Sequence, residues 1–173
     1  MYYSFIILKP ETLDRDLVSP VLGRLLSIGV KIEIFDYVHV TEDLIDQHYR
    51  ENIEKYGGMF REKAHRSFAG KYVIPVIVSS TSYNVIQEIR VLVGATDPTK
   101  AEAGTIRADF GIDSIDKAMS EGRCCENLIH ASDSREAYLF EAELWFGKET
   151  ASKYALPEQT QGGPYVPKGR KLR

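Results

Sequence analysis

Residues 2–10 read YYSFIILKP, an aromatic and β-branched run that ends in a lysine and a proline. Such a run favours a β-strand. No glycine-rich turn follows it, although doubly wound parallel folds usually bind phosphate at such a turn after their first strand. The start of the chain therefore favours a different arrangement of strands and helices.

Caps, breakers and apolar spacing predict the other elements. In chain order we expect strand 2–9, a helix opened by Ser19-Pro20 and ended by Gly29, a half-buried strand over 30–40, a helix over 42–54 capped by Thr41, a helix over 59–71 after Gly57-Gly58, strand 73–79, a helix from Ser82 or Asn84 to Val93, strand 127–130, a helix over 135–146 capped by Ser134 and a short helix over 148–154. Residues 95–126 carry few regular signals. The main elements give the order β-α-β-β-α-β. This order predicts an α/β (α+β) fold, a ferredoxin-like, mostly antiparallel sheet with helices on one face and extra helical insertions.

The composition suits one domain of 173 residues, with 43% hydrophobic residues and a net charge of -3. We expect a domain over 1–156 and a C-terminal tail over 157–173, ordered only where an oligomer contact holds it. The weak charge gives no reason to expect nucleic acid as the main partner. No signal peptide or apolar run of about 20 residues is present, so no membrane partner is expected. Cys124 and Cys125 are adjacent, a spacing that seldom forms a bridge, which favours the reducing cytoplasm.

The densest polar cluster lies around His130, in residues 127–134 (NLIHASDS), and neither GxxxxGK[ST] nor GxGxxG occurs. An imidazole at a strand end would lie near the N–H groups of the helix that Ser134 opens, and such groups attract phosphate. Glu141 on that helix could bond one ring nitrogen and leave the other as a nucleophile. From the residues alone, a histidine bonded in the core beside an ordinary helix cap is an equally open interpretation.

Three segments together resemble the signature segments of nucleoside diphosphate kinases: 7–11 (ILKPE), 104–110 (GTIRADF) and 127–134 (NLIHASDS). They occur in the family's order, and the resemblance extends from Tyr3 to about Tyr154. It implies an enzyme that transfers the γ-phosphate of a nucleoside triphosphate to a nucleoside diphosphate. The expected mechanism is ping-pong, through a phosphorylated His130.

The resemblance also implies roles for individual residues. The expected catalytic residues are His130, Lys9, Glu141, Ser132 and Tyr49, and the expected nucleotide ligands are Lys9, Arg90, Thr96, Arg107 and Asn127. In detail, Tyr49 would contact the lysine and the phosphate region, and Asn127 would bond near the sugar hydroxyls. Taken singly, each of these residues could equally be a solvated charge, a packed ring or part of a plain turn. Only their joint occurrence favours the site.

The family resemblance implies partners as well. ATP and other nucleoside di- and triphosphates would bind with Mg²⁺, which would bridge phosphate oxygens and keep most of its shell as water, so no protein metal ligand is expected. A homo-oligomer is expected, with a hexamer favoured over a tetramer.

Three segments depart from the family pattern. Residues 50–75 are longer than usual and lack Pro-Phe-Phe, which leaves Phe60 as the first candidate to stack on the base and Phe68 as the second. Residues 111–126 are also longer, and we expect them over the sugar or at a subunit contact. In the tail, Tyr165 and Val166 are the expected anchors.

Two alternatives remain open from the sequence. The chain could be a kinase-fold binding or regulatory protein with weak or lost catalysis, which only the basic end of the tail favours: Lys168, Arg170, Lys171 and Arg173. It could also be a phosphohistidine enzyme with a narrower choice of base. A decayed copy should lack the histidine, the lysine or an arginine, and the presence of His130, Lys9, Arg90 and Arg107 favours the active kinase.

Overall fold

The computed structural model describes residues 1–155. The predicted tail, with Tyr165, Val166 and the basic end, lies outside the described residues. Four strands form the main sheet in the order β2-β4-β1-β5: β1 (Tyr2–Leu8), β2 (Lys31–Phe35), β4 (Tyr72–Ser80) and β5 (Ile129–Ala131). A short β3 (Val38–His39) pairs with β4, and every strand pair in residues 1–155 is antiparallel. This is the strand order of a ferredoxin-like sheet, and the predicted fold class is confirmed.

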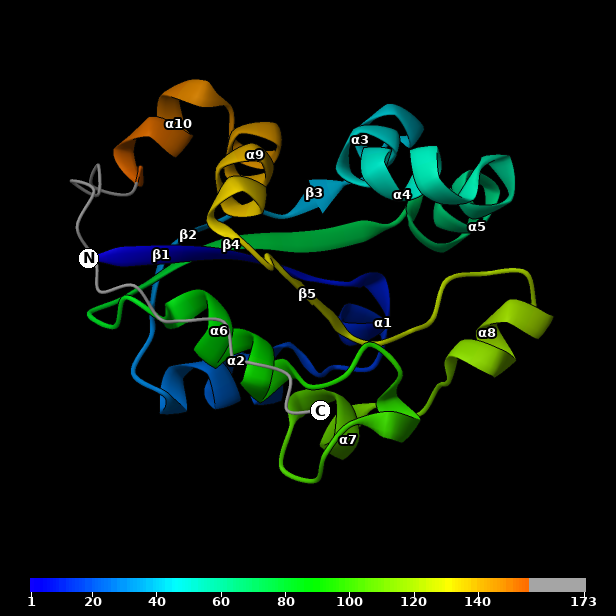
Figure 1. Ribbon diagram of the computed structural model, residues 1–173, viewed down its shortest axis with the longest axis horizontal. Coiled ribbons are helices and arrows are strands. Elements are labelled where there is room, and N and C mark those ends of the chain that lie inside the picture. The colour runs from blue at the N-terminus through cyan, green and yellow to red at the C-terminus, as the bar shows by residue number, and fades with distance from the viewer. Residues whose placement is uncertain (156–173) are drawn as a thin grey trace, which may run out of the picture.

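Helices cover both faces of this sheet (Figure 1). The two crossover helices, α2 (Val18–Ser27) and α6 (Val85–Val93), share one apolar cluster with Ile6 and Leu8 of β1. The other cluster contains Phe5 and Ile7, whose side chains alternate with those two along the strand. It packs against the additional helices, among them α3 (Glu42–His48), α5 (Gly58–Phe68) and α9 (Arg135–Phe146). The sequence analysis placed helices on one face, which holds for α2 and α6, whereas the insertions cover the second face.

The predicted helix over 42–54 is two helices. Thr41 caps α3 through a bond from the Leu44 N–H to its hydroxyl, as predicted. Tyr49, with φ -99° and ψ 21°, ends α3, and α4 (Arg50–Tyr56) begins at the next residue. A change of direction at Tyr49 brings its ring to the cavity described below.

Residues 95–126 contain short helices that the sequence analysis did not predict. They are the 3₁₀ helix η1 (Pro98–Lys100), α7 (Ile106–Phe110) and α8 (Ile115–Ser120). The short helix α1 (Pro10–Asp14), which follows β1, was not predicted either. Thr105 and Ser114 cap α7 and α8 with their side chains. η1 has three residues and the three α-helices have five or six each, so all are too short to show an apolar period.

Residues 30–40 do not form one half-buried strand. β2 ends at Phe35, β3 follows as a separate pair of residues, and the register of β2 shifts between Ile32 and Ile34. β2 is an edge strand, and within residues 1–155 only Ile34 among its residues is shielded to an intermediate degree, while Phe35 is 66% exposed.

The remaining predictions match closely. Ser134 caps α9 by accepting a bond from the Ala137 N–H, and α10 (Lys148–Lys153) follows. None of the helices in residues 1–155 combines the length and apolar character that a bilayer crossing needs. Cys124 and Cys125 are free thiols.

Candidate active site

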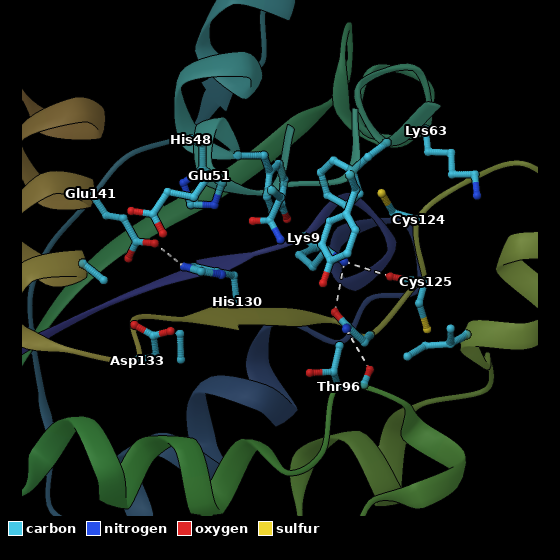
Figure 2. Close-up of a pocket in the computed structure, with 18 of the residues that line it drawn as sticks. Lys9, His48, Glu51, Lys63, Thr96, Cys124, Cys125, His130, Asp133 and Glu141 are labelled. Carbon is cyan, nitrogen blue, oxygen red and sulfur yellow. Dashed lines mark hydrogen bonds and ion pairs between the residues drawn. The ribbon is translucent and has the colours of Figure 1, made fainter. Parts of the chain in front are cut away.

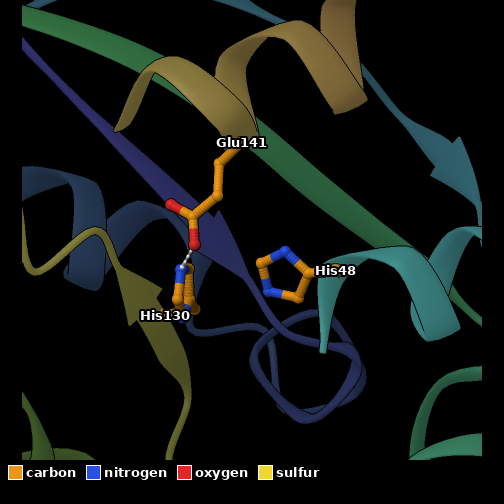
Figure 3. A group of neighbouring side chains, drawn as sticks. All are labelled: His48, His130 and Glu141. Atoms are coloured by element: carbon orange, nitrogen blue, oxygen red, sulfur yellow. Dashed lines mark hydrogen bonds and ion pairs between the residues drawn. The ribbon is translucent and has the colours of Figure 1, made fainter. Parts of the chain in front are cut away.

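His130 lies at the middle of β5, opposite Ile7 of β1. Its Nε2 is 2.7 Å from Oε1 of Glu141 on α9 (Figure 3). The fully buried Ser132 donates its hydroxyl to the other carboxylate oxygen, Oε2. A carboxylate accepts, so Nε2 carries the proton and the lone pair of the ring is on Nδ1. The residues therefore build an oriented imidazole whose Nδ1 can act as a nucleophile.

A second histidine, His48 at the end of α3, stands edge-to-face to His130 with ring centroids 4.7 Å apart. The indole N–H of Trp145 points to Nδ1 of His48 at 3.3 Å. Burial, followed by the nearby His130 and Lys9, lowers the pKa of His48 well below its ordinary value. His48 was not among the predicted site residues. Its position directly before Tyr49 was the only signal that could have found it.

His48, His130 and Glu141 bring three potential ligand atoms within 4.8 Å of one another (Figure 3). Two imidazole nitrogens and a carboxylate suit zinc better than magnesium, which prefers oxygen ligands. Because Glu141 already orients His130, this cluster is better described as the support of the nucleophile than as a magnesium site.

Lys9 follows β1 and is 5% exposed. Its ammonium donates to the carbonyl of Cys125 at 2.9 Å and to Oδ1 of Asn127 at 3.0 Å. It also lies 3.5 Å from a carboxylate oxygen of Glu11 and 5.1 Å from the centre of the Phe68 ring. These contacts fix a cation at the end of β1 that is next to His130 through the β1–β5 pairing.

The guanidinium groups of Arg107, on α7, and of Arg90, on α6, both lie along β5. Arg107 donates to three backbone carbonyls, those of Gly94, Asn127 and Ile129. Burial and the neighbouring Arg90 lower the pKa of Arg107 to about 10. With this pKa the Arg107 guanidinium still carries its charge at neutral pH. The forked donors of both arginines suit phosphate oxygens.

These groups line one cavity of about 1160 Å³ (Figure 2). Nine of the predicted site residues line it: Lys9, Tyr49, Phe60, Arg90, Thr96, Arg107, Asn127, His130 and Glu141. Ser132 lies behind Glu141 and does not. Figure 2 also shows the carboxylates of Glu51 and Asp133 near His130.

Some predicted contacts differ in detail. Tyr49 lines the cavity, but the hydrogen bonds of Lys9 go to Cys125 and Asn127. The Tyr49 ring instead packs edge-on against Phe60, and burial strongly raises its pKa. The amide of Asn127 donates to the carbonyl of Thr96 at 2.9 Å, so in this structure it joins Lys9 to the loop after α6.

The two lengthened segments form the mouth of the cavity. Figure 1 shows α4–α5 and α8 on either side of the same end of the molecule. Phe60 lines the cavity, whereas Phe68 is 3% exposed, belongs to the core and is unavailable to a base. Ile115 and Met119 line it from α8.

The rest of the segment 111–126 is tied down by a buried carboxylate. Asp113 accepts two bonds from Arg123, at 2.6 and 3.0 Å, and a third from the backbone N–H of Glu126. The Arg123 guanidinium holds the pKa of the Asp113 carboxyl well below its usual range. The segment is therefore a fixed wall of the cavity.

Comparison with known proteins now decides the family. The family model described as nucleoside diphosphate kinase matches residues 3–151.

The chain belongs to the nucleoside diphosphate kinase family.

Curated relatives agree over most of their length. A nucleoside diphosphate kinase of Methanothermobacter thermautotrophicus is 35% identical over 92% of this chain and 96% of the relative. One from Streptococcus pneumoniae is 36% identical over 84% of this chain and 100% of the relative. The chain is therefore a phosphotransferase that moves the terminal phosphate of a nucleoside triphosphate to a nucleoside diphosphate.

Solved structures of the family share the fold. A transition-state mimic of the nucleoside diphosphate kinase from Borrelia burgdorferi, with bound vanadate and ADP, superposes with a TM-score of 0.79, 25% identity and 92% coverage of both chains. An NDP kinase from Pyrobaculum aerophilum gives a TM-score of 0.76 with 27% identity, covering 87% of this chain and 98% of that one.

Proposed function

We propose that this nucleoside diphosphate kinase works by a ping-pong mechanism through phospho-His130. The Nδ1 lone pair attacks the γ-phosphorus, the P–N bond forms, and the bond from phosphorus to the β-γ bridging oxygen breaks. The diphosphate leaves with that oxygen, and the terminal oxygen of a second diphosphate then takes the phosphoryl group back from Nδ1. The observation that carries this proposal is the 2.7 Å bond between His130 Nε2 and Glu141, because it orients the ring and leaves Nδ1 free to attack.

The positions of the cations support the placement of the phosphates. Lys9 at the end of β1, Arg90 on α6 and Arg107 on α7 line the cavity together with His130, so they can neutralise the β- and γ-phosphates while Nδ1 faces the phosphorus. Thr96 and Asn127 lie next to them and suit phosphate oxygens and the sugar. Positioning and charge neutralisation supply most of the catalysis in phosphoryl transfer.

The base would lie at the mouth, between Phe60 and the apolar side chains of α8. Phe60 is half-buried beside Tyr49 and Tyr56. Stacking on a flat ring does not discriminate strongly between bases, which supports the use of several nucleotides. Equal turnover of several diphosphate acceptors would remove the alternative of a narrow substrate choice.

Mg²⁺ fits this cavity as a companion of the nucleotide. Glu51 and Asp133 present carboxylate oxygens to the cavity, and such oxygens suit the water shell of Mg²⁺. We therefore expect the ion to be held mainly by phosphate oxygens and water. When bound, it supplies neutralisation of phosphate charge.

The edge strand supports a homo-oligomer. β2 exposes Ile32 (36%) and Phe35 (66%), and neighbouring Tyr37 is 59% exposed. An edge strand with such side chains offers both free backbone groups and apolar surface for association. We propose a hexamer in preference to a tetramer, with the domain over 1–156 as its unit and the tail over 157–173 at a contact.

The free, adjacent thiols Cys124 and Cys125 suit a reducing compartment, so we propose the cytoplasm as the location.

The deciding experiment is incubation with ATP labelled on the γ-phosphate and with Mg²⁺. The wild type should take up acid-labile, base-stable phosphate that GDP discharges, and His130→Ala should take up none. His39→Ala, which changes an exposed histidine of β3, is the matched control and should label like the wild type. Absence of label on the wild type would contradict the proposal and favour the binding or regulatory alternative.

A further inference from the structure

Leu128, two residues before the nucleophile, has an unusual backbone. Its φ is 72°, and its side chain is fully buried. The N–H of Ile129 bonds back to the carbonyl of Asn127 at 2.8 Å, so Leu128 is the centre of a γ-turn. A γ-turn with positive φ is rare and strained, and for a large branched side chain it persists only where the surroundings impose it.

The first turn of α1 imposes this conformation. The carboxylate of Glu11 accepts the Leu128 N–H at 2.9 Å. The Leu128 carbonyl accepts two bonds, from the Lys9 N–H at 2.9 Å and from the Thr12 hydroxyl at 2.5 Å. The N–H and the carbonyl of Leu128 are thus held by the side chains of Glu11 and Thr12, 117 and 116 residues away, and by the backbone of Lys9. Glu11 and Thr12 are themselves buried, at 8% and 0% exposure.

The γ-turn in turn determines where the phosphate-binding groups lie. The carbonyls on either side of Leu128, those of Asn127 and Ile129, both accept bonds from Arg107. The side chain of Asn127 accepts from Lys9. His130 is only two residues further along, so a relaxed Leu128 would displace the nucleophile and two cations together.

We propose that Glu11 and Thr12 are positioning residues for phosphoryl transfer: they hold Leu128 in its strained turn and thereby place His130, Lys9 and Arg107. This inference rests on the proposed function of His130. Glu11 also lies near Lys9, so the test must distinguish the hydrogen bond between Glu11 and the Leu128 N–H from the ion pair between Glu11 and Lys9.

Steady-state kinetics with ATP and GDP make that separation. Glu11→Ala leaves the Leu128 N–H without its acceptor and should lower kcat about 100-fold, the scale expected when reacting groups move by about 1 Å. Glu11→Gln keeps an acceptor oxygen but loses the charge, so it should stay within about tenfold of the wild type. Thr12→Val, of equal size but without the hydroxyl, should lower kcat about tenfold. Asp14→Asn, an exposed carboxylate of the same helix, is the control and should leave kcat unchanged. The KM for ATP should change less than kcat in all of them.

Amide hydrogen exchange gives a readout that does not depend on activity. In Glu11→Ala the Leu128 amide should exchange at least about tenfold faster, while Ile6 and Ile77 in the sheet keep their wild-type protection. Equal acceleration of all three amides would mean general destabilisation and would overturn the inference. A Glu11→Gln variant with a kcat as low as that of Glu11→Ala would also overturn the inference. In that case the charge of Glu11, and not its hydrogen bond to the Leu128 N–H, would determine the rate. A wild type that forms no phosphohistidine would refute the proposed function. If the wild type is labelled and Glu11→Ala keeps the kcat of the wild type, only the role of Glu11 is refuted.

Discussion

At the scale of single residues, the proposed chemistry requires two neighbouring imidazole rings, those of His48 and His130, to be neutral. The proposed attack by His130 uses a lone pair, and a charged His48, with its ring centroid 4.7 Å from that of His130, would weaken that nucleophile and repel the Lys9 ammonium. Trp145 donates to Nδ1 of His48, so the neutral His48 ring carries its proton on Nε2. Burial keeps that neutral form by lowering the pKa. We infer that His48 gives the nucleophile a polar but uncharged neighbour.

The lowered pKa of His48 predicts a pH-dependent stability. Unfolded His48 titrates near pH 6.5 and folded His48 well below that value, so the unfolded state binds more protons as the pH falls below 6.5. The stability contributed by neutral His48 is therefore complete above pH 6.5 and is lost as the pH falls. Urea unfolding from pH 7.5 to 5 should show a smaller loss for His48→Gln than for the wild type, with a difference approaching about 1.4 kcal/mol per pH unit. His39→Gln serves as the control, and identical slopes for wild type and His48→Gln would contradict the prediction.

Among the structural elements, the loops between helices place the arginine that we propose to bind phosphate, Arg107. Gly94 ends α6 with φ 88°, and its carbonyl accepts a bond from Arg107 at 3.0 Å. A Cβ at this position would come within 2.5 Å of the Thr105 hydroxyl, which caps α7. Only glycine therefore fits at position 94, where the end of α6, the start of α7 and the Arg107 guanidinium meet.

Gly104 is a matched control for Gly94. It has nearly the same φ, 87°, but nothing lies within 4 Å of an added Cβ. Gly104→Ala should therefore cost only the backbone strain, about 1–2 kcal/mol. Gly94→Ala should add the clash with Thr105 and exceed this loss, with a total of roughly 3 kcal/mol or more. It should also raise the KM for ATP through Arg107, which Gly104→Ala should leave unchanged. Thermal unfolding and kinetics of the two variants test the argument, and equal effects would refute it.

At the scale of the whole molecule, the sheet has one protected edge and one open edge. β5 is short and is followed directly by Ser132, whose N–H bonds to the carbonyl of Phe5 in β1. β2 at the other edge leaves Ile32 and Phe35 exposed. The first edge holds His130, and the second exposes the apolar side chains that fit the proposed subunit contact.

Light scattering should therefore give a mass several times the chain mass of 19.6 kDa. Phe35→Glu places a charge on the open edge and should shift the distribution to smaller species. Tyr83→Glu, a change of an equally exposed aromatic residue outside β2, should not. A monomeric wild type would contradict both the oligomer and the assignment of this edge.

Local signals in the sequence determined much of this protein. The caps at Thr41 and Ser134 are bonds to an N–H three residues away, so a short stretch of sequence contains both partners. The apolar runs of β1 and β4 and the order of the main elements were sufficient to predict a ferredoxin-like sheet. The segment 127–134 made His130 a candidate, because its chemistry and its helix cap lie within eight residues, and the resemblance of this and two other segments to one family favoured the catalytic interpretation.

Tertiary structure alone decided the rest, because the partners are far apart in the chain. The turn at Leu128 depends on Glu11, which is 117 residues away, and a leucine gives no local sign of positive φ. The burial of Phe68 in the core leaves Phe60 as the ring that we propose to stack on the base. The tautomer of the neutral His48 ring depends on Trp145, 97 residues away. Such contacts form only when the sheet brings distant segments together, and packing then fixes conformations that the local sequence leaves open.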